Sequence, residues 1–311
     1  MSVLIAADFD AADWATWWPA LTAALPGERL VRSVAEAAGD AIDIALVANP
    51  PAGALQGLGS LRLIQSLWAG VDKLLADPTV PPGVPLARMV DPAMNAAMAE
   101  TALWAVLGLQ RDLFDYAASQ RAAQWRPLPQ QRASDLTVAV LGLGQMGRAV
   151  ARRLVHHGCQ VHGWSTRPCA VDGVQTHAGD AAWPAVLATA QIVVNLLPLT
   201  PATRGLFNAS AFAQMQRGAS LVNLARGAHV VEVDLLAALD AGHLHRAVLD
   251  VFATEPLPAT HPFWSHPRVT VLPHVAAQTD PRSAAAVVAA NVVACRRGLP
   301  VAHLVDRARG Y

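Results

Sequence analysis

The chain has 311 residues, of which 53% are hydrophobic and 15% are charged. This length accommodates two domains of ordinary size, and the apolar content predicts well-filled cores and excludes a disordered chain. Acidic and basic residues balance at 23 each, so no charge excess points to nucleic acid or to a membrane surface as a partner.

The cysteines and the first residues together predict a cytoplasmic protein. Cys159, Cys169 and Cys295 are odd in number and lack metal-ligand spacing, which favours a reduced compartment and no bound metal. The start of the chain lacks the basic segment and long apolar core of a signal peptide. The longest uncharged apolar run, residues 283–295, is too short to span a bilayer.

The first hundred residues predict a small parallel sheet. Short apolar runs alternate there with Ala-rich helical segments and with Pro or Gly turns. The predicted strands are Val3–Ala7, Arg29–Ser33, Ile42–Ala48, Arg62–Leu67 and Leu86–Val90. Such alternation favours a sheet that helices cover on both faces. No glycine-rich fingerprint occurs in this unit, so we expect the nucleotide to bind elsewhere.

The loop directly after the fourth predicted strand contains Trp68, Ala69 and Gly70. Small residues there can leave backbone N–H groups open to a substrate carboxylate. A simple turn between a strand and a helix explains the same residues equally well, so the residues alone leave both interpretations open. Beyond this loop, Met94–Phe114 predicts one long apolar helix that joins the first unit to a second.

The second unit begins with a glycine-rich motif between a strand and a helix. Thr137–Leu141 predicts a buried strand, Gly142, Gly144 and Gly147 follow with the spacing Gly-x-Gly-x-x-Gly, and residues 148–154 have helical apolar spacing. In a dinucleotide site, the first glycine permits the tight turn, the second lets the backbone approach a pyrophosphate, and the third lets helix and strand pack closely. Free N–H groups at the helix start would bind the pyrophosphate. Alone, such a triplet is more often a tight turn, but in this setting it predicts a dinucleotide site.

Six strands separated by helices predict a complete doubly wound nucleotide-binding fold in this unit. They are Thr137–Leu141, Gln160–Trp164, Ile192–Leu196, Ser220–Leu224, Ala247–Val251 and Val269–Leu272. We expect the final apolar helix, Ala284–Arg297, to return to the first unit. The prediction is therefore an α/β protein with two doubly wound parallel-sheet domains. Residues 98–278 form a Rossmann NAD(P)-binding domain, and residues 1–97 with 279–311 form a smaller, discontinuous, flavodoxin-like substrate (catalytic) domain.

Polar residues at the strand ends mark the candidate active site, because ligands of open parallel sheets bind outside the carboxyl ends of the strands. Arg226 follows the fourth strand of the second unit, Asp250 ends the fifth, and Glu255 comes shortly after it. His274 follows the sixth strand. Singly, each has an ordinary explanation as a surface, capping or loop residue. Their joint placement at one edge of a nucleotide-binding sheet is the composition of a dehydrogenase site.

The residues after the second strand of this unit predict the choice of cofactor. An NAD site places an acidic residue there to hold the ribose 2′-hydroxyl. Here Ser165, Thr166 and Arg167 occupy the position, and no acid occurs between residues 158 and 171. An arginine can bind the 2′-phosphate that a carboxylate would repel, although Arg167 could also point into solvent. We therefore predict NADPH as the preferred cofactor, with NADH as an alternative.

Five motifs in order resemble those of the D-isomer-specific 2-hydroxyacid dehydrogenase family over nearly the whole chain. They are the glycine fingerprint, Leu197–Pro201, Asn223–Gly227, Asp250–Pro256 and Pro273–Ala276. Within that family, Leu224–Glu232 and the tail Val305–Tyr311 resemble the bacterial glyoxylate/hydroxypyruvate reductases A. The resemblance implies two α/β units, the first closed by the C-terminal helix.

The resemblance also implies a role for each site residue. Arg226 and the backbone of the Ala69–Gly70 loop hold the substrate carboxylate, and this chain adds the indole of Trp68 at that loop. His274 is the acid–base, and Glu255 orients it and favours its protonated form. The residues expected to contact the cofactor are Gly142, Gly144, Gln145, Met146, Gly147, Ser165, Thr166, Arg167, Leu197, Pro198, Thr203, Ala225, Asp250, His274 and Ala276.

The reaction implied is the NADPH-dependent reduction of a small 2-oxoacid by a homodimer, with glyoxylate or hydroxypyruvate as substrate. One departure bears on the substrate: the reductases resembled have an aromatic and a basic residue where this chain has Ala48 and Asn49. Two alternatives therefore stay open. One is a reductase for a larger 2-oxoacid, of the D-lactate type. The other is a nucleotide-sensing corepressor without enzymatic activity, against which the chain shows no interaction tail or basic arm.

Overall fold

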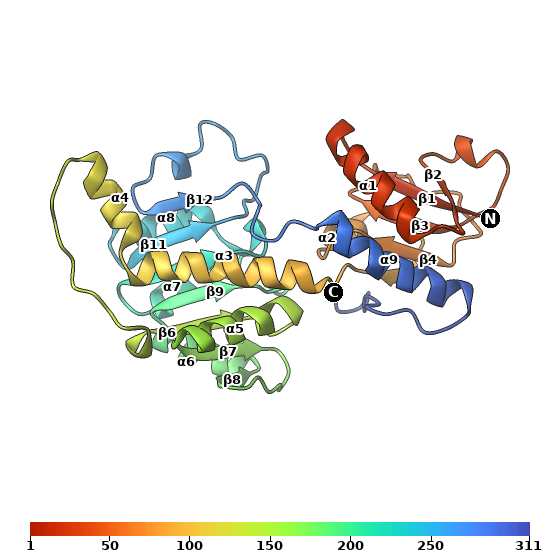
Figure 1. Ribbon diagram of the computed structural model, residues 1–311. Coiled ribbons are helices and arrows are strands. Elements are labelled where there is room, and N and C mark those ends of the chain that lie inside the picture. The colour runs from red at the N-terminus through yellow and green to blue at the C-terminus, as the bar shows by residue number, and fades with distance from the viewer. The chain divides into compact units, whose positions relative to one another are not determined.

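The computed structural model describes residues 1–311 and divides into two compact units. Unit 1 comprises Met1–Met94 and Thr279–Tyr311, and unit 2 comprises Asn95–Gln278. The red and blue ends of the chain therefore belong to the same unit (Figure 1). None of the helices combines the length and the apolar character that a membrane span requires.

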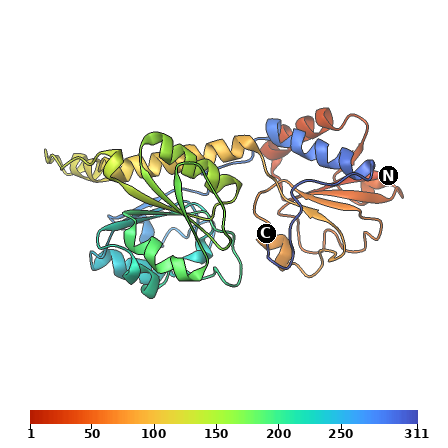
Figure 2. The same ribbon diagram turned by 90° about the horizontal axis from the view of Figure 1, so that it is seen from below.

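Unit 1 is built on a five-stranded parallel sheet with the strand order β2-β1-β3-β4-β5. The strands are β1 (Ser2–Ala7), β2 (Arg29–Val31), β3 (Ile42–Ala48), β4 (Leu63–Ser66) and β5 (Leu86–Ala87). The helices are α1 (Ala11–Ala24), the 3-10 turn η1 (Ala35–Ala37), α2 (Asp72–Ala76) and α9 (Pro281–Arg296). Every residue of β3 and β4 is buried, including the polar side chains of Asp43, Gln65 and Ser66. The last helix, α9, packs against α1 (Figures 1 and 2).

Unit 2 contains a seven-stranded parallel sheet with the order β12-β11-β10-β9-β6-β7-β8. The strands are β6 (Thr137–Leu141), β7 (Gln160–Ser165), β8 (Val174–Ala178), β9 (Ile192–Asn195), β10 (Ala219–Asn223), β11 (Leu244–Leu249) and β12 (Val269–Val271). Further helices are η2 (Ala133–Asp135), α5 (Gln145–His157), η3 (Asp180–Ala182), α6 (Trp183–Thr189), α7 (Ala209–Gln214), η4 (Gly227–His229), α8 (Glu232–Asp240) and η5 (Pro262–Trp264). The predicted α/β class with two parallel sheets is confirmed.

The predicted number of six strands in this sheet is wrong, because β8 was missed. Its sequence, Val-Gln-Thr-His-Ala, lies at the sheet edge, and none of its residues is fully buried. Such a strand lacks the apolar run by which central strands are found. β6 shows the opposite case: Val138 and Val140 belong to the core on one face of the sheet, and Ala139 and Leu141 to the core on the other.

The single long helix predicted for Met94–Phe114 is also wrong. The structure has two helices there, α3 (Pro92–Gln110) and α4 (Leu113–Arg121). The chain turns at Asp112, which adopts a left-handed conformation with φ of 53°. The turn brings the Phe114 ring onto α3 at Gly108, where a Cβ atom would lie 2.4 Å from the ring. A glycine at this point therefore permits the close approach of the two helices.

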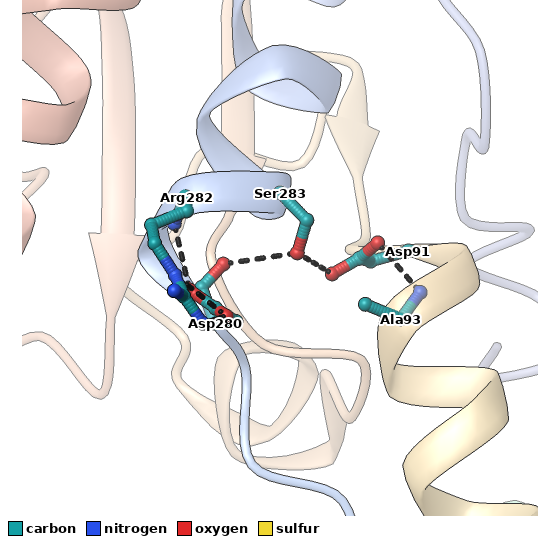
Figure 3. Close-up of polar contacts among 5 residues, drawn as sticks. All are labelled: Asp91, Ala93, Asp280, Arg282 and Ser283. Carbon is teal, nitrogen blue, oxygen red and sulfur yellow. Dashed lines mark hydrogen bonds and ion pairs between the residues drawn. The ribbon is translucent and has the colours of Figure 1, made fainter.

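Two segments of the chain connect the units, and their unit 1 ends are hydrogen-bonded to each other (Figure 3). Buried Asp91 accepts a hydrogen bond from the Ala93 backbone N–H at the start of α3, at 3.0 Å. Its other carboxylate oxygen accepts one from the Ser283 hydroxyl in α9, at 2.6 Å. Asp280 caps α9 through the Arg282 backbone N–H, at 2.9 Å. The starts of α3 and α9 are thus joined by one hydrogen-bonded cluster, which we call the Asp91–Ser283 clasp.

Candidate active site

The glycine-rich loop after β6 is closely packed at two of its three glycines. Gly142 has a φ of 95°, and a Cβ atom there would lie 2.7 Å from the Leu196 carbonyl oxygen. A Cβ atom on Gly147 would lie 1.7 Å from the carbonyl oxygen of Gly142. Neither position has room for a side chain, so helix α5 can approach the strand only because both are glycine.

The third glycine, Gly144, faces open space and begins helix α5. No atom lies within 4 Å of the place where its Cβ would be, and no side chain caps the helix there. The first-turn N–H groups, which include those of Gln145 and Met146, therefore have no side-chain acceptor. An uncapped helix start beside open space fits a pyrophosphate, which would accept hydrogen bonds from these groups. Arg148, which sequence analysis did not identify, supports the loop through its hydrogen bond to the Leu143 carbonyl at 3.0 Å.

The turn after β7 carries the residues predicted to select the cofactor. The Ser165 hydroxyl donates to the Arg167 carbonyl at 2.7 Å, so it shapes the turn itself. Thr166 and Arg167 are exposed to solvent. The guanidinium of Arg167 is thus the cationic group of this turn, with no carboxylate beside it in the sequence. These features fit a 2′-phosphate better than a free 2′-hydroxyl.

His274 and Glu255 form a close pair after β12 and β11. The imidazole Nδ1 lies 2.7 Å from Glu255 Oε2, and the other carboxylate oxygen accepts from the Phe252 backbone N–H at 2.9 Å. Burial raises the pKa of Glu255, but the hydrogen bonds from His274 and Phe252 outweigh it and hold that pKa below its ordinary value. The ionised carboxylate can only accept, so Nδ1 carries the shared hydrogen. The His274 side chain is 50% exposed, which leaves Nε2 as the nitrogen for exchanging a proton with a substrate.

Asp250 holds the backbone on both sides of this histidine. Its carbonyl oxygen accepts from the His274 backbone N–H at 2.9 Å. Its carboxylate accepts from the backbone N–H groups of Val275 at 2.7 Å and Ala276 at 3.0 Å. Burial raises the pKa of Asp250, and these two N–H groups oppose that rise. The role supported here is that of a brace for the His274 turn, whose histidine has a left-handed φ of 56°.

Arg226 follows β10 and lies close to the same pair. Gly227 packs directly on the next loop, where a Cβ atom would lie 1.8 Å from the Phe252 carbonyl carbon. The positive charge of Arg226 contributes to the lowered pKa of Glu255. One of its guanidinium nitrogens donates to the Ala225 carbonyl at 2.7 Å. The structure therefore brings Arg226, Glu255 and His274 to one edge of the sheet, as their positions after successive strands predict.

The loop after β9 is closed on itself by a threonine. The Thr203 hydroxyl donates to the Pro198 carbonyl at 2.7 Å and accepts from the Thr200 backbone N–H at 2.9 Å. Leu197, near the start of the loop, is buried. Thr203 therefore fixes the loop, and its role toward the cofactor remains a prediction.

The predicted substrate loop lies in unit 1. Ser66 fixes it, because its hydroxyl donates to the Trp68 carbonyl at 2.9 Å and accepts from the Trp68 N–H at 3.0 Å. The Trp68 ring packs edge-on against Trp17, with ring centroids 5.7 Å apart. Ala69 and Gly70 are half-buried. Ala48 is buried within β3, so any effect of its small size on a substrate would be indirect.

Sequence analysis assigned no role to Asn195, Asn223 or His229, all fully buried near the same sheet edge. Asn195 and Asn223 end β9 and β10 and lie opposite each other in the parallel register. An asparagine at the end of an apolar strand is the sequence pattern that could have indicated them. A buried amide at such a position needs hydrogen-bond partners from neighbouring segments.

Asp112, Asp115 and His245 place one possible ligand atom each within 4.8 Å of the others, although the sequence predicted no metal site. Asp115 already forms ion pairs with Arg246 at 2.8 Å and with His245 at 3.3 Å. The guanidinium neutralises part of the negative charge that would attract a cation. We therefore interpret the group as an ion-pair cluster beside the α3–α4 turn.

Comparison with known proteins places these features in one family. Residues 103–276 match the family model described as D-isomer specific 2-hydroxyacid dehydrogenase, NAD binding domain. A glyoxylate/hydroxypyruvate reductase A from Serratia proteamaculans is 46% identical over 274 residues, which cover 86% of this chain and 88% of that protein. Another protein of that name, from Yersinia enterocolitica, is 43% identical over the same shares.

Solved structures agree over the full length. A D-isomer specific 2-hydroxyacid dehydrogenase from Xanthobacter autotrophicus Py2, in complex with NADPH and MES, has a TM-score of 0.93 at 41% identity and covers 100% of this chain and 99% of its own. An NADPH-dependent glyoxylate/hydroxypyruvate reductase from Sinorhizobium meliloti, in complex with NADP and sulfate, has a TM-score of 0.93 at 36% identity and covers 100% of both chains. This chain therefore belongs to the D-isomer-specific 2-hydroxyacid dehydrogenases, a family of NAD(P)-dependent oxidoreductases.

Proposed function

We propose that this protein reduces a small 2-oxoacid to the D-2-hydroxyacid with NADPH, and that glyoxylate and hydroxypyruvate are its leading substrates. The observation that carries the proposal is the 2.7 Å pair of His274 and Glu255 beside Arg226, at the carboxyl edge of a nucleotide-binding sheet. The names of the relatives from Serratia and Yersinia support the choice of substrates.

The residues that would hold the cofactor fit it. The N–H groups at the start of α5 are the proposed site for the pyrophosphate, and the exposed Arg167 is the proposed partner of the 2′-phosphate. When bound, the nicotinamide supplies a hydride for the substrate carbonyl carbon. The Xanthobacter and Sinorhizobium structures, which contain NADPH and NADP, support this choice of cofactor.

The side chains supply the remaining chemistry. Arg226 binds the substrate carboxylate, for which the planar guanidinium offers two parallel N–H donors that a lysine ammonium lacks. His274 donates a proton from Nε2 to the substrate oxygen, and Glu255 remains ionised and stabilises the imidazolium before the transfer. The backbone of Ala69 and Gly70, with Trp68 beside it, is the proposed second contact for the substrate.

A steady-state assay with NADPH and a panel of 2-oxoacids tests the proposal. We expect oxidation of NADPH with glyoxylate and hydroxypyruvate, and weaker turnover with pyruvate and bulkier 2-oxoacids. The replacement of an aromatic and a basic residue by Ala48 and Asn49 favours, as second candidate, a reductase for a larger substrate. A preference for bulky 2-oxoacids would select that candidate. No turnover with any of them would leave the nucleotide-sensing alternative.

We also propose that the protein is a homodimer. Several large apolar side chains of unit 2 are solvent-exposed in the single chain, among them Trp104 (43%), Leu113 (53%), Trp125 (100%) and Trp264 (53%). The Trp104 ring packs on Phe114, which follows Leu113 in the chain, and exposed apolar side chains of this kind favour a surface that a partner covers. Light scattering is expected to give twice the mass of one chain. The free thiols of all three cysteines accord with the proposed cytoplasmic location.

A further inference from the structure

Three fully buried polar side chains lie where strands β9 and β10 end. Asn195, Asn223 and His229 each have 0% of their surface exposed. Burial of polar side chains costs free energy unless hydrogen bonds replace the lost water, so each of them must have partners. Most of those partners are backbone groups of the two loops that follow the strands, rather than groups within the strands.

Asn223 shapes the turn that carries Arg226. Its Nδ2 donates to the Arg226 carbonyl oxygen at 3.0 Å, and its Oδ1 accepts from the Ala225 backbone N–H at 3.3 Å. One side chain thus holds both a donor and an acceptor of the same short turn. The position of the Arg226 backbone depends directly on this amide.

Asn195 links that turn to the neighbouring loop. Its Oδ1 accepts from the Leu197 backbone N–H at 3.2 Å, which orients the amide. Its Nδ2 can then donate to Asn223 Oδ1 at 2.9 Å and to His229 Nδ1 at 3.1 Å. Both hydrogens of this amide therefore point toward the Arg226 side of the network.

His229 completes the connection. The Pro198 carbonyl can only accept, so His229 Nε2, at 3.3 Å from it, carries the hydrogen. Nδ1 is then the acceptor that Asn195 requires. The donors and acceptors of these contacts match without conflict. A satisfied buried network of this kind makes the surrounding backbone rigid.

We propose that Asn195, Asn223 and His229 are positioning residues that hold the Arg226 turn and the Leu197–Thr203 loop at a fixed spacing. This inference rests on the proposed function, in which Arg226 binds the substrate carboxylate, and on the prediction that the Leu197–Thr203 loop contacts the cofactor. The three residues touch neither substrate nor cofactor. They act by keeping the guanidinium where a 2-oxoacid bound beside the nicotinamide presents its carboxylate.

The first test is Asn223→Asp, which keeps the size of the side chain and exchanges the donor Nδ2 for an oxygen. An ionised carboxylate repels the Arg226 carbonyl, whereas a protonated carboxyl donates to it. We expect kcat/KM for glyoxylate at alkaline pH to fall about 10- to 100-fold, the loss typical of a displaced binding group. The ratio of variant to wild type should recover as the pH is lowered. NADPH affinity, measured by fluorescence titration, should stay nearly unchanged.

Two variants of His229 test the same inference if Asn223→Asp does not fold. His229→Gln retains one acceptor and one donor, whereas His229→Leu removes both at similar volume. Because His229 reaches the Pro198 loop, we expect His229→Leu to weaken NADPH binding and to lower kcat/KM. His229→Gln should restore much of both. Equal losses in the two variants would overturn the inference, since volume and not hydrogen bonding would then be the cause.

Gln191→Glu is the matched control at the other end of β9. The Gln191 side-chain oxygen accepts from the Thr137 backbone N–H at 3.0 Å, and a carboxylate can still accept there. We expect its kcat/KM to match the wild type at every pH. The inference would be overturned, with the proposed function intact, if the ratio of Asn223→Asp to wild-type kcat/KM did not change with pH. The same conclusion would follow if Gln191→Glu lost activity with the same pH dependence. Absence of turnover by the wild-type protein would overturn the proposed function and this inference with it.

Discussion

His274 is the residue whose replacement separates chemistry from binding. His274→Ala removes the proton donor and leaves the glycine-rich loop untouched. General acid catalysis contributes about 10²–10⁴-fold, so we expect a loss of that order in kcat with nearly unchanged NADPH affinity. His266→Ala is the control, because that histidine pairs with Asp240 at 3.1 Å outside the proposed site. Activity of His274→Ala within a few-fold of the wild type would exclude the histidine as the acid.

The ionised Glu255 carboxylate, paired with His274, is expected to make the stability of the folded protein depend on pH in the acid range. Its pKa in the folded protein is lowered from the ordinary value of 4.5, so its contribution to stability is present above that value and is lost as the pH falls below it. Glu255→Gln cannot titrate and forfeits this contribution at all pH values. We expect the melting temperatures of the two proteins to differ at neutral pH and to converge below pH 4.5. A constant difference down to acid pH would show that the carboxylate charge does not stabilise the fold.

The choice between NADPH and NADH is expected to depend on one side chain, that of Arg167. Arg167→Ala removes the cation of the turn after β7 and should weaken NADPH binding while leaving NADH binding nearly the same. Charge-assisted hydrogen bonds to phosphate are among the stronger polar contacts in proteins, so the preference should shrink markedly. Arg152→Ala, at an exposed arginine of helix α5, is a control that removes the same charge elsewhere in unit 2. Equal efficiency of the wild-type protein with both cofactors would contradict the assignment.

The residues of the proposed site were predictable to different degrees. Arg226, Glu255 and His274 were found because each follows a strand that the sequence marks clearly, and the carboxyl ends of parallel strands share one edge. Asn195 and His229 were not, because partners such as Asn223 Oδ1 and the Pro198 carbonyl belong to other segments of the chain. A sequence shows where a polar residue lies but not which distant carbonyl it meets.

At the scale of elements, burial decided which predictions hold. Buried strands such as β3 were located within a residue or two, since coverage on both faces favours a long apolar run, here Ile44–Ala48. The edge strand β8 carries no such run. The break between α3 and α4 depends on the fit of Phe114 against Gly108, a tertiary contact that apolar periodicity does not encode.

The Asp91–Ser283 clasp gives a prediction about two helix starts. Ser283→Ala removes the donor to Asp91 Oδ2, and Asp91 is only 2% exposed, so water replaces the hydroxyl poorly. An unsatisfied buried acceptor costs about 1–3 kcal/mol, and we expect urea unfolding to report a loss of that size. Ser134→Ala, at an exposed hydroxyl 3.1 Å from Asp135, should change stability little. Equal effects of the two substitutions would mean that the clasp does not stabilise the chain.

At the scale of the whole molecule, we propose that each unit is a domain able to fold by itself. The two cores of unit 2 lie on opposite faces of its sheet and consist only of residues between 98 and 276. A fragment of residues 95–278 is therefore expected to unfold cooperatively and to bind NADPH. It should not reduce glyoxylate, because the Trp68–Gly70 loop is absent from it. A fragment without a cooperative transition would contradict the division.

The packing of the glycine-rich loop has a consequence for how this protein can evolve. Gly142 and Gly147 have no room for a side chain, so almost any substitution there would be purged before it could be tested for a new use. The turn of Thr166 and Arg167 is exposed and can drift at little cost to folding. A change of preference between NADPH and NADH would therefore arise through substitutions in this exposed turn. The glycine-rich loop that is proposed to bind the pyrophosphate would stay the same.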